Sequence, residues 1–165
     1  MLPIALDPAV LRIGLAGTGE GFARRRATLA EGGVEPIPVL SDTPLAGLHV
    51  LFAAGLPRSE AHALAARARA AGVLVNVEDV PELCDFHVPA VVRRGDLALT
   101  VSTNGRAPGL SRLLREWLAR VFGPEWTGRL DEVAHAREIW RAEGLAPSDV
   151  SERTRDLVVG QGWLP

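Results

Sequence analysis

Short apolar runs alternate with helix-forming segments over the first half of the chain. The apolar runs predict strands at Leu11–Ala16, Val34–Leu40, His49–Ala54 and Val73–Val77. Between them the pattern predicts helices at Phe22–Glu31 and Ser59–Ala71, each followed by glycine. Strands that alternate with helices form parallel sheets with right-handed crossovers. We therefore predict an α/β fold, with a small Rossmann-like parallel sheet over residues 1–92.

Two of these strands carry features that set their place in the sheet. His49–Ala54 is almost entirely apolar, as expected for a strand covered on both faces. Pro36 and Pro38 each remove a backbone donor from Val34–Leu40, so this strand should be irregular or at an edge. Ligands of such sheets bind beyond the carboxyl ends of the strands. Those ends carry Gly17, Gly55 and the segment Asn76–Asp79.

The pattern changes in the second half, where two short strands and three helices are predicted. They are Ala90–Val92 and Leu97–Ser102, then Leu110–Phe122, Pro124–Ala142 and a last helix that Ser148 could cap and that ends at Gly160. In the first of these helices, apolar residues recur every three or four positions, which favours a subunit interface or a core. We separate a region 93–122 from a C-terminal helical segment 123–165.

Composition and charge narrow the classes of protein. The chain has 165 residues and a formal net charge of −2, which gives no reason to expect binding to nucleic acid or to a membrane surface. Cys84 is the only cysteine, which excludes an internal disulfide and fits a reducing compartment. We find no apolar run of about 18 residues and no signal peptide in the first ten residues. We expect a cytoplasmic protein.

A glycine loop, Gly17-Thr18-Gly19, lies between the first strand and the first helix, where a dinucleotide-binding fingerprint would lie. Glycines let a pyrophosphate approach the backbone, and the helix start offers free N–H groups. Phe22 stands where the third small residue is expected, so a glycine turn without a nucleotide is the alternative. Arg24, Arg25 and Arg26 follow, and they either contact an anionic ligand or form a solvated face.

Residues 76–108 carry most of the candidate chemistry. An acidic turn follows the fourth strand, and it contains Glu78, Asp79, Glu82 and Asp85. Carboxylates at that strand end suit acid–base catalysis, although they could simply solvate a loop. A basic turn with Arg93 and Arg94 comes next, and a second polar turn spans Ser102–Pro108.

As a whole, this segment resembles the signature N-V-x-D-x-P-E-L-C-D-F-x-x-P-A-x-x-R-R-G-D-L of the precorrin-2 dehydrogenase/sirohydrochlorin ferrochelatases of sirohaem synthesis. The second polar turn resembles their S-[ST]-x-G-x-[SA]-P, which opens the dimerisation region. The resemblance covers about residues 10–122 and is tightest from 73 to 118. It implies NAD-dependent oxidation of precorrin-2 to sirohydrochlorin, insertion of ferrous iron as a substrate, and a homodimer.

The resemblance also implies roles for single residues. Asp79 would act in both reactions, because a carboxylate can take a proton as hydride leaves and accept pyrrole protons as iron enters. Arginine suits the carboxylates of a tetrapyrrole, and we favour Arg106 and one of the pair Arg93–Arg94. The other candidate substrate contacts are Asn76, Thr103, Asn104 and Gly105, and the candidate NAD contacts are Gly17, Thr18, Gly19, Asp42 and Gly55. No metal site is certain, although Asp79 and His87 could contact iron in passing.

Two departures from the family concern the NAD pocket. The stretch Ser41–Leu48 is shorter than usual, and the third strand ends Ala53-Ala54-Gly55-Leu56-Pro57 in place of A-A-T-D-[DN], with Ala61 where an Asn is usual. We therefore expect weak NAD binding, which Gly55→Thr with Leu56→Asp should tighten. Two alternatives to the bifunctional enzyme stay open: a ferrochelatase with a degenerate NAD site, and a tetrapyrrole-binding dimer without catalysis.

Overall fold

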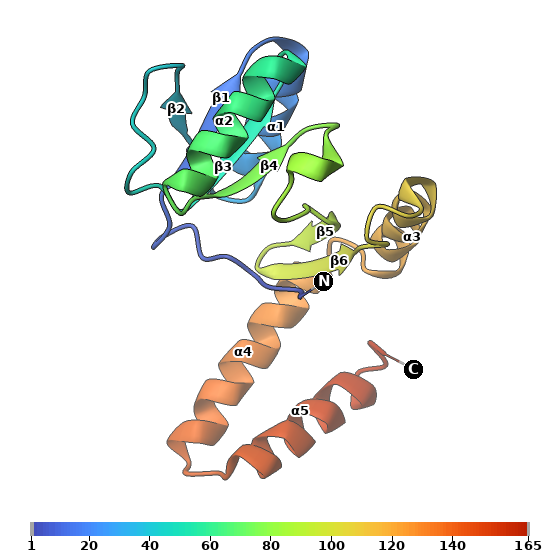
Figure 1. The fold of residues 1–165 in the computed structure, drawn as a ribbon. Helices are drawn as coiled ribbons and strands as arrows, with labels where there is room; N and C mark the ends of the chain where they lie inside the picture. Colours follow the sequence, from blue (N-terminus) through green and yellow to red (C-terminus); the bar gives the residue numbers. More distant parts are fainter. Residues whose placement is uncertain (1, 165) are drawn as a thin grey trace. The chain divides into compact units, whose positions relative to one another are not determined.

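A computed structural model describes residues 2–164 of the chain (Figure 1). The chain divides into two units, of which the first ends at Val88 and the second begins at Pro89. Strand β5 (Ala90–Arg94) pairs with β6 (Leu97–Val101), so both lie in the second unit. The predicted domain boundary between residues 92 and 93 would cut this hairpin. Met1 and Pro165, the outer ends of the predicted segments, lie outside the described residues.

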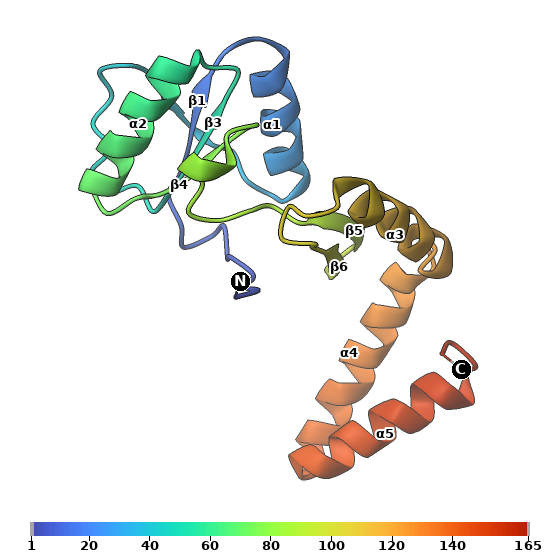
Figure 2. The same cartoon turned by 45° about the vertical axis from the view of Figure 1, so that its right-hand side comes forward.

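The first unit is a four-stranded parallel sheet with a helix on each face. Its elements are β1 (Ile13–Gly17), α1 (Gly19–Glu31), β2 (Ile37–Val39), β3 (Val50–Ala54), α2 (Arg58–Ala70), β4 (Leu74–Val77) and a short 3-10 turn, η1 (Pro81–Leu83). The strand order is β2-β1-β3-β4 with parallel pairing throughout. Figure 2 shows α1 and α2 on opposite faces. The predicted Rossmann-like sheet is confirmed, and β2 is a short edge strand, in agreement with Pro38 within it and Pro36 just before it.

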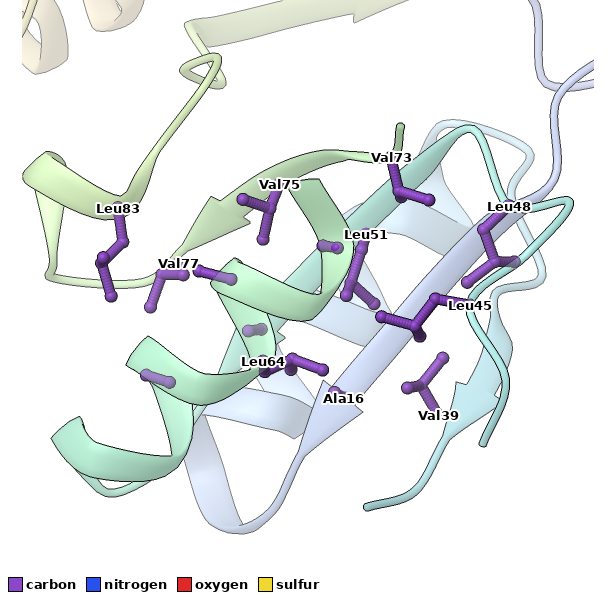
Figure 3. Close-up of a cluster of buried hydrophobic side chains, with 14 residues drawn as sticks. Ala16, Val39, Leu45, Leu48, Leu51, Leu64, Val73, Val75, Val77 and Leu83 are labelled. Carbon is purple, nitrogen blue, oxygen red and sulfur yellow. The ribbon is translucent and has the colours of Figure 1, made fainter. Parts of the chain in front are cut away.

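Two apolar layers hold the sheet. On the α2 side, Leu51, Val75 and Ala65 are fully buried, and Figure 3 shows the cluster around the first two. Alanines fill the buried face of α2, which lets the helix lie close to the strands. On the α1 side, Phe52 and Leu15 pack with Leu29. Burial of each large side chain stabilises the fold by about 1.5–3 kcal/mol, so the two layers together hold the four strands in one sheet.

The second unit combines the β5–β6 hairpin with three helices, α3 (Pro108–Val121), α4 (Trp126–Ala142) and α5 (Pro147–Gly160). Helices α4 and α5 pack as an antiparallel pair (Figure 1). The prediction that Ser148 caps α5 is wrong, because the helix begins at Pro147 and the Ser148 hydroxyl bonds to Asp149. Proline suits the first helical position, since it needs no N–H there. No helix within residues 2–164 is long and apolar enough to cross a membrane.

Candidate functional site

A cleft of about 390 Å³ lies at the carboxyl end of β4. Its walls come from α1, from the end of β4 and from the loop that follows, all within the first unit. The polar side chains that line it are Arg25, Asn76, Glu78, Asp79 and His87. This position matches the edge at which parallel α/β sheets bind ligands. A second depression, of about 300 Å³, is lined by Leu45, Ala70, Ala71 and Arg67 and holds no acid–base group.

Asp79 is the uncommitted carboxylate of the cleft. Its backbone has φ 60°, a left-handed conformation that is uncommon outside glycine and costs about 1–2 kcal/mol. The side chain is exposed, and it forms no hydrogen bond or ion pair with any residue from 2 to 164. Backbone strain of this kind recurs at functional sites. A strained turn therefore presents a free carboxylate at a strand end.

Other acidic residues of the same loop have structural roles. Asp85 accepts hydrogen bonds from the backbone N–H of Val75 and from Nε of Arg69, both at 2.9 Å. Glu82 pairs with Arg58 at 2.6 Å on the surface. These two carboxylates therefore hold the loop or solvate it, which is the bland alternative raised by the sequence. Asp79 differs from both, because it is exposed and has no partner among residues 2–164.

Asn76 and Cys84 tie the loop back to β4. Asn76 is only 6% exposed, and its Nδ2 donates to the carbonyl of Phe86 at 2.9 Å. Its amide oxygen accepts no hydrogen bond from the described residues and is free for a ligand in the cleft. Sγ of Cys84 accepts from the Val77 N–H at 3.3 Å and lies 3.2 Å from the Val77 carbonyl. These contacts pack the Cys84 thiol against the end of β4.

The glycine loop is packed against the turn after β3. A Cβ atom on Gly17, with φ 130°, would lie 1.7 Å from the carbonyl oxygen of Ala54. One on Gly55, with φ 68°, would lie 2.0 Å from the carbonyl oxygen of Thr18. The Thr18 hydroxyl donates to the Gly55 carbonyl at 3.3 Å. Gly17 and Gly55 are thus required by the close approach of two loops, a reason that the sequence did not reveal.

Gly19 differs, because a Cβ atom there would meet nothing within 4 Å. It begins α1, ahead of the predicted start at Phe22, and its open surroundings fit the approach of a pyrophosphate to the helix start. Asp42, a candidate NAD contact, is exposed beyond the carboxyl end of β2. The expected tightening of NAD binding by Gly55→Thr with Leu56→Asp assumes an otherwise intact pocket, whereas a side chain at Gly55 would displace the Thr18 backbone.

Arg94 has a different role from the expected substrate contact. Its Nε donates to the carbonyl of Phe122 at 2.7 Å, and its Nη2 donates to that of Ala119 at 3.0 Å. These carbonyls end α3, so Arg94 caps that helix and fixes it to β5. Arg93 is exposed and makes no side-chain contact of this kind with residues 2–164. Of the pair, Arg93 is therefore the one available to a ligand.

In the polar turn before α3, some polar groups are hydrogen-bonded to neighbouring residues and others are free. The Thr103 hydroxyl lies 3.0 Å from that of Ser111 and accepts from the Ala107 N–H at 3.2 Å, which agrees with a turn or cap role. Asn104 and Gly105 have φ 53° and 75° and are exposed. Arg106 is exposed, and its guanidinium has no hydrogen-bond partner among the described residues. This turn and the cleft belong to different units.

Arg25 is the one of three successive arginines that lines the cleft, and the sequence did not show which of them would face a ligand. It lies three positions after Phe22 and four before Leu29, so helical spacing places it on the face of α1 that packs against the sheet. That spacing was the signal that could have selected it. Among residues 2–164, no three histidine, cysteine or acidic side chains form a group that could hold a metal ion.

Comparisons with known proteins agree with the sequence signature. A family model described as "Putative NAD(P)-binding" matches residues 23–90, and one described as "Sirohaem biosynthesis protein central" matches residues 94–120. The siroheme synthase of Psychrobacter arcticus is 44% identical over 73 residues, which cover 44% of this chain and 13% of that protein. The siroheme synthase of Methylobacillus flagellatus is 38% identical over 104 residues, or 62% of this chain and 22% of that protein.

The resemblance to the sirohaem-synthesis proteins is confirmed. Among solved structures, a precorrin-2 dehydrogenase matches with a TM-score of 0.68 and 18% identity, over 96% of this chain and 89% of that one. At this identity, the match shows a shared fold. The chain spans between 13% and 22% of the length of the siroheme synthases of Psychrobacter arcticus, Nitrosococcus oceani and Methylobacillus flagellatus.

Proposed function

We propose that the cleft at β4 binds a tetrapyrrole of sirohaem synthesis and that Asp79 is its acid–base group. The observation that carries the proposal is the free Asp79 carboxylate, held in a strained turn at the end of a buried strand. Siroheme synthases are similar to this chain, the "Putative NAD(P)-binding" model spans the cleft residues, and the "Sirohaem biosynthesis protein central" model matches the segment after them. The proposed reactions are oxidation of precorrin-2 to sirohydrochlorin and insertion of ferrous iron to give sirohaem.

Both reactions require a group that accepts protons. In the oxidation, a C–H bond of the macrocycle loses a hydride, and Asp79 takes the proton that leaves with it. NAD, when bound, supplies the hydride acceptor. In the iron step, two pyrrole N–H protons must leave as the Fe²⁺ substrate enters, and Asp79 accepts them in turn and passes them to solvent. An exposed carboxylate suits the second task, because it exchanges protons freely with water.

The glycine loop fits a pyrophosphate better than it fits the rest of NAD. The open space at Gly19 and the free N–H groups of the first turn of α1 would hold the phosphates. Gly55-Leu56 offers no polar side chain to the ribose or nicotinamide. We therefore place the bifunctional enzyme first, with NAD binding weak and iron insertion less impaired than oxidation. We also propose a cytoplasmic location, with which a single cysteine is compatible.

We also propose a homodimer formed through α3. The apolar stripe of this helix is exposed in the single chain, with Leu113 64% and Trp117 51% accessible. Ion pairs flank the stripe, and the hydrogen bond from Arg112 lowers the pKa of the Glu116 carboxyl. A stable dimer would bury more than about 1,000 Å² in total. Light scattering at micromolar concentration should return the mass of two chains, and Trp117→Glu should shift it to one.

The deciding experiment is an anaerobic absorbance assay on precorrin-2, with NAD and then ferrous iron added. Conversion to sirohydrochlorin after NAD, and to sirohaem after iron, is the expected result. Iron insertion into supplied sirohydrochlorin, with no NAD-dependent oxidation of precorrin-2, would support the ferrochelatase alternative. Binding with no turnover would support the tetrapyrrole-binding dimer. No spectral response to either tetrapyrrole would contradict the proposal.

A further inference from the structure

Arg25 occupies an unusual place among the cations of the first unit. Its side chain is half-buried and lines the cleft, and its guanidinium carbon lies 5.3 Å from the centroid of the Phe52 ring. Arginine on an aromatic face is held by the ring quadrupole, while its N–H groups lie in the guanidinium plane and stay free to donate. This contact therefore holds the charge near the ring without occupying its donors.

The two neighbouring arginines show the contrast. Arg24 lies 3.7 Å from Glu20 and 3.9 Å from Glu78, and Arg26 pairs with Glu35 at 3.2 Å. Arg25 forms no ion pair and no side-chain hydrogen bond with any of residues 2–164. Three successive cations on one helix thus have different surroundings, and the one without a carboxylate partner is the one in the cleft.

The platform beneath Arg25 is itself fixed. The Phe52 ring packs edge to face against Phe86, with centroids 5.3 Å apart and an interplanar angle of 87°. The carbonyl of Phe86 accepts the hydrogen bond from Asn76, so β3, β4 and the following loop together define the position of the guanidinium. A preorganised cation loses little freedom when it binds an anion.

We infer that Arg25 binds a carboxylate of the tetrapyrrole and so places the macrocycle over Asp79. The inference rests on the proposed function. A ligand that carries carboxylates would be repelled by Glu78 and Asp79 unless the cleft supplied a cation, and Arg25 is the cation that lines it. A guanidinium fork matches a carboxylate with two parallel hydrogen bonds.

A dinucleotide phosphate is a less suitable partner for Arg25. The residue lies six positions after Gly19, which is about 9 Å along the helix axis, whereas phosphates bind at the first turn. The lining of the cleft includes Arg25, Asp79 and His87, and within residues 2–164 it draws nothing from the loop Gly17–Gly19. The position of Arg25 thus favours the tetrapyrrole.

The test compares Arg25→Gln with the matched control Arg26→Gln. Each substitution removes one positive charge, and the two positions are neighbours on α1. Sirohydrochlorin binding is measured by absorbance titration without NAD or iron. Arg25→Gln should raise Kd about 10–100-fold, the loss expected for a charge-assisted hydrogen bond, while Arg26→Gln should stay within about twofold of wild type. Arg25→Lys should fall between them, because the ammonium keeps the charge but not the fork.

Two further arms separate the outcomes. The sirohydrochlorin methyl ester, which has no free carboxylates, should bind wild type and Arg25→Gln equally, and NAD titration should be the same for both. Equal binding of sirohydrochlorin itself to the two proteins, or a loss of NAD affinity alone in Arg25→Gln, would overturn the inference and leave the proposed function standing. A wild-type protein that binds no sirohydrochlorin would overturn both.

Discussion

Two loops lie at the carboxyl edge of the same sheet, and they use their polar groups in opposite ways. The glycine loop is closed on its neighbour, because Gly17 and Gly55 pack against backbone carbonyls and the Thr18 hydroxyl donates to Gly55. The loop after β4 is held by Asp85 within it and by Asn76 of β4. Because these two residues make the structural contacts, Asp79 stays free in the loop after β4. The glycine loop offers a ligand mainly backbone N–H groups.

This difference explains why we expect weak NAD binding at the glycine loop but substrate binding and proton transfer at the cleft after β4. A site built from backbone N–H groups binds a phosphate but discriminates poorly along the rest of a dinucleotide. A site with a free carboxylate and a stacked cation can position a substrate and move a proton. Substitutions in the two loops should therefore have different consequences.

Asp79→Asn should lower the rate of iron insertion, and of oxidation where it occurs, by about 10²–10⁴-fold, the contribution of a general acid–base group. Asparagine tolerates the left-handed backbone at this position, so the fold should be retained. Initial rates in the anaerobic absorbance assay measure the effect. Glu82→Gln, which changes a surface-paired carboxylate of the same loop, is the control. Wild-type rates from Asp79→Asn would remove it from the mechanism.

Gly55→Thr should lower the free energy of unfolding by about 2–4 kcal/mol, from the left-handed backbone and the displaced Thr18 carbonyl. Gly72→Ala is the matched control, since its φ of 73° is similar but a Cβ atom there meets nothing within 4 Å. Its cost should be only about 1–2 kcal/mol. Urea denaturation measures both. Equal losses would show that the two loops do not need their close approach.

Asp85→Ala should destabilise the protein by about 2–3 kcal/mol, because the Val75 N–H and Arg69 lose a charged acceptor. Glu82→Ala removes a more exposed carboxylate of the same loop and should cost about 0–1 kcal/mol. The comparison again uses urea denaturation. If Asp85→Ala were as mild as Glu82→Ala, the loop would be held by its apolar contacts instead.

NAD should bind the unmodified protein weakly, with Kd in the range of about 0.1–1 mM, because two or three polar contacts of about 0.5–1.5 kcal/mol each are missing. Gly19→Ala should weaken it a further fivefold to tenfold, from about 1 kcal/mol of steric conflict with the phosphates. Calorimetric titration measures both. A tight complex, or one indifferent to Gly19→Ala, would show that the nucleotide uses other contacts.

Much of the architecture could be predicted from local sequence patterns. Alternating apolar runs and helical segments predicted the parallel sheet, and Pro36 and Pro38 predicted an irregular or edge strand, because both depend on local backbone chemistry. The candidate Asp79 came from its position after a strand within a specific signature. Element ends were less certain: α1 began at Gly19 rather than Phe22, since a helix start depends on the backbone around it.

What the sequence alone determined about this protein is therefore its fold class, its signature and the loop that carries Asp79. Tertiary structure decided which polar residues of that signature are free. Asp85 and Asp79 are equally acidic in sequence, but only the folded chain brings Val75 and Arg69 to one of them. Likewise, Arg94 and Arg25 look alike until α3 and Phe52 are in place. The physical reason is that partners far apart in sequence, rather than residue type, decide whether a charge is paired.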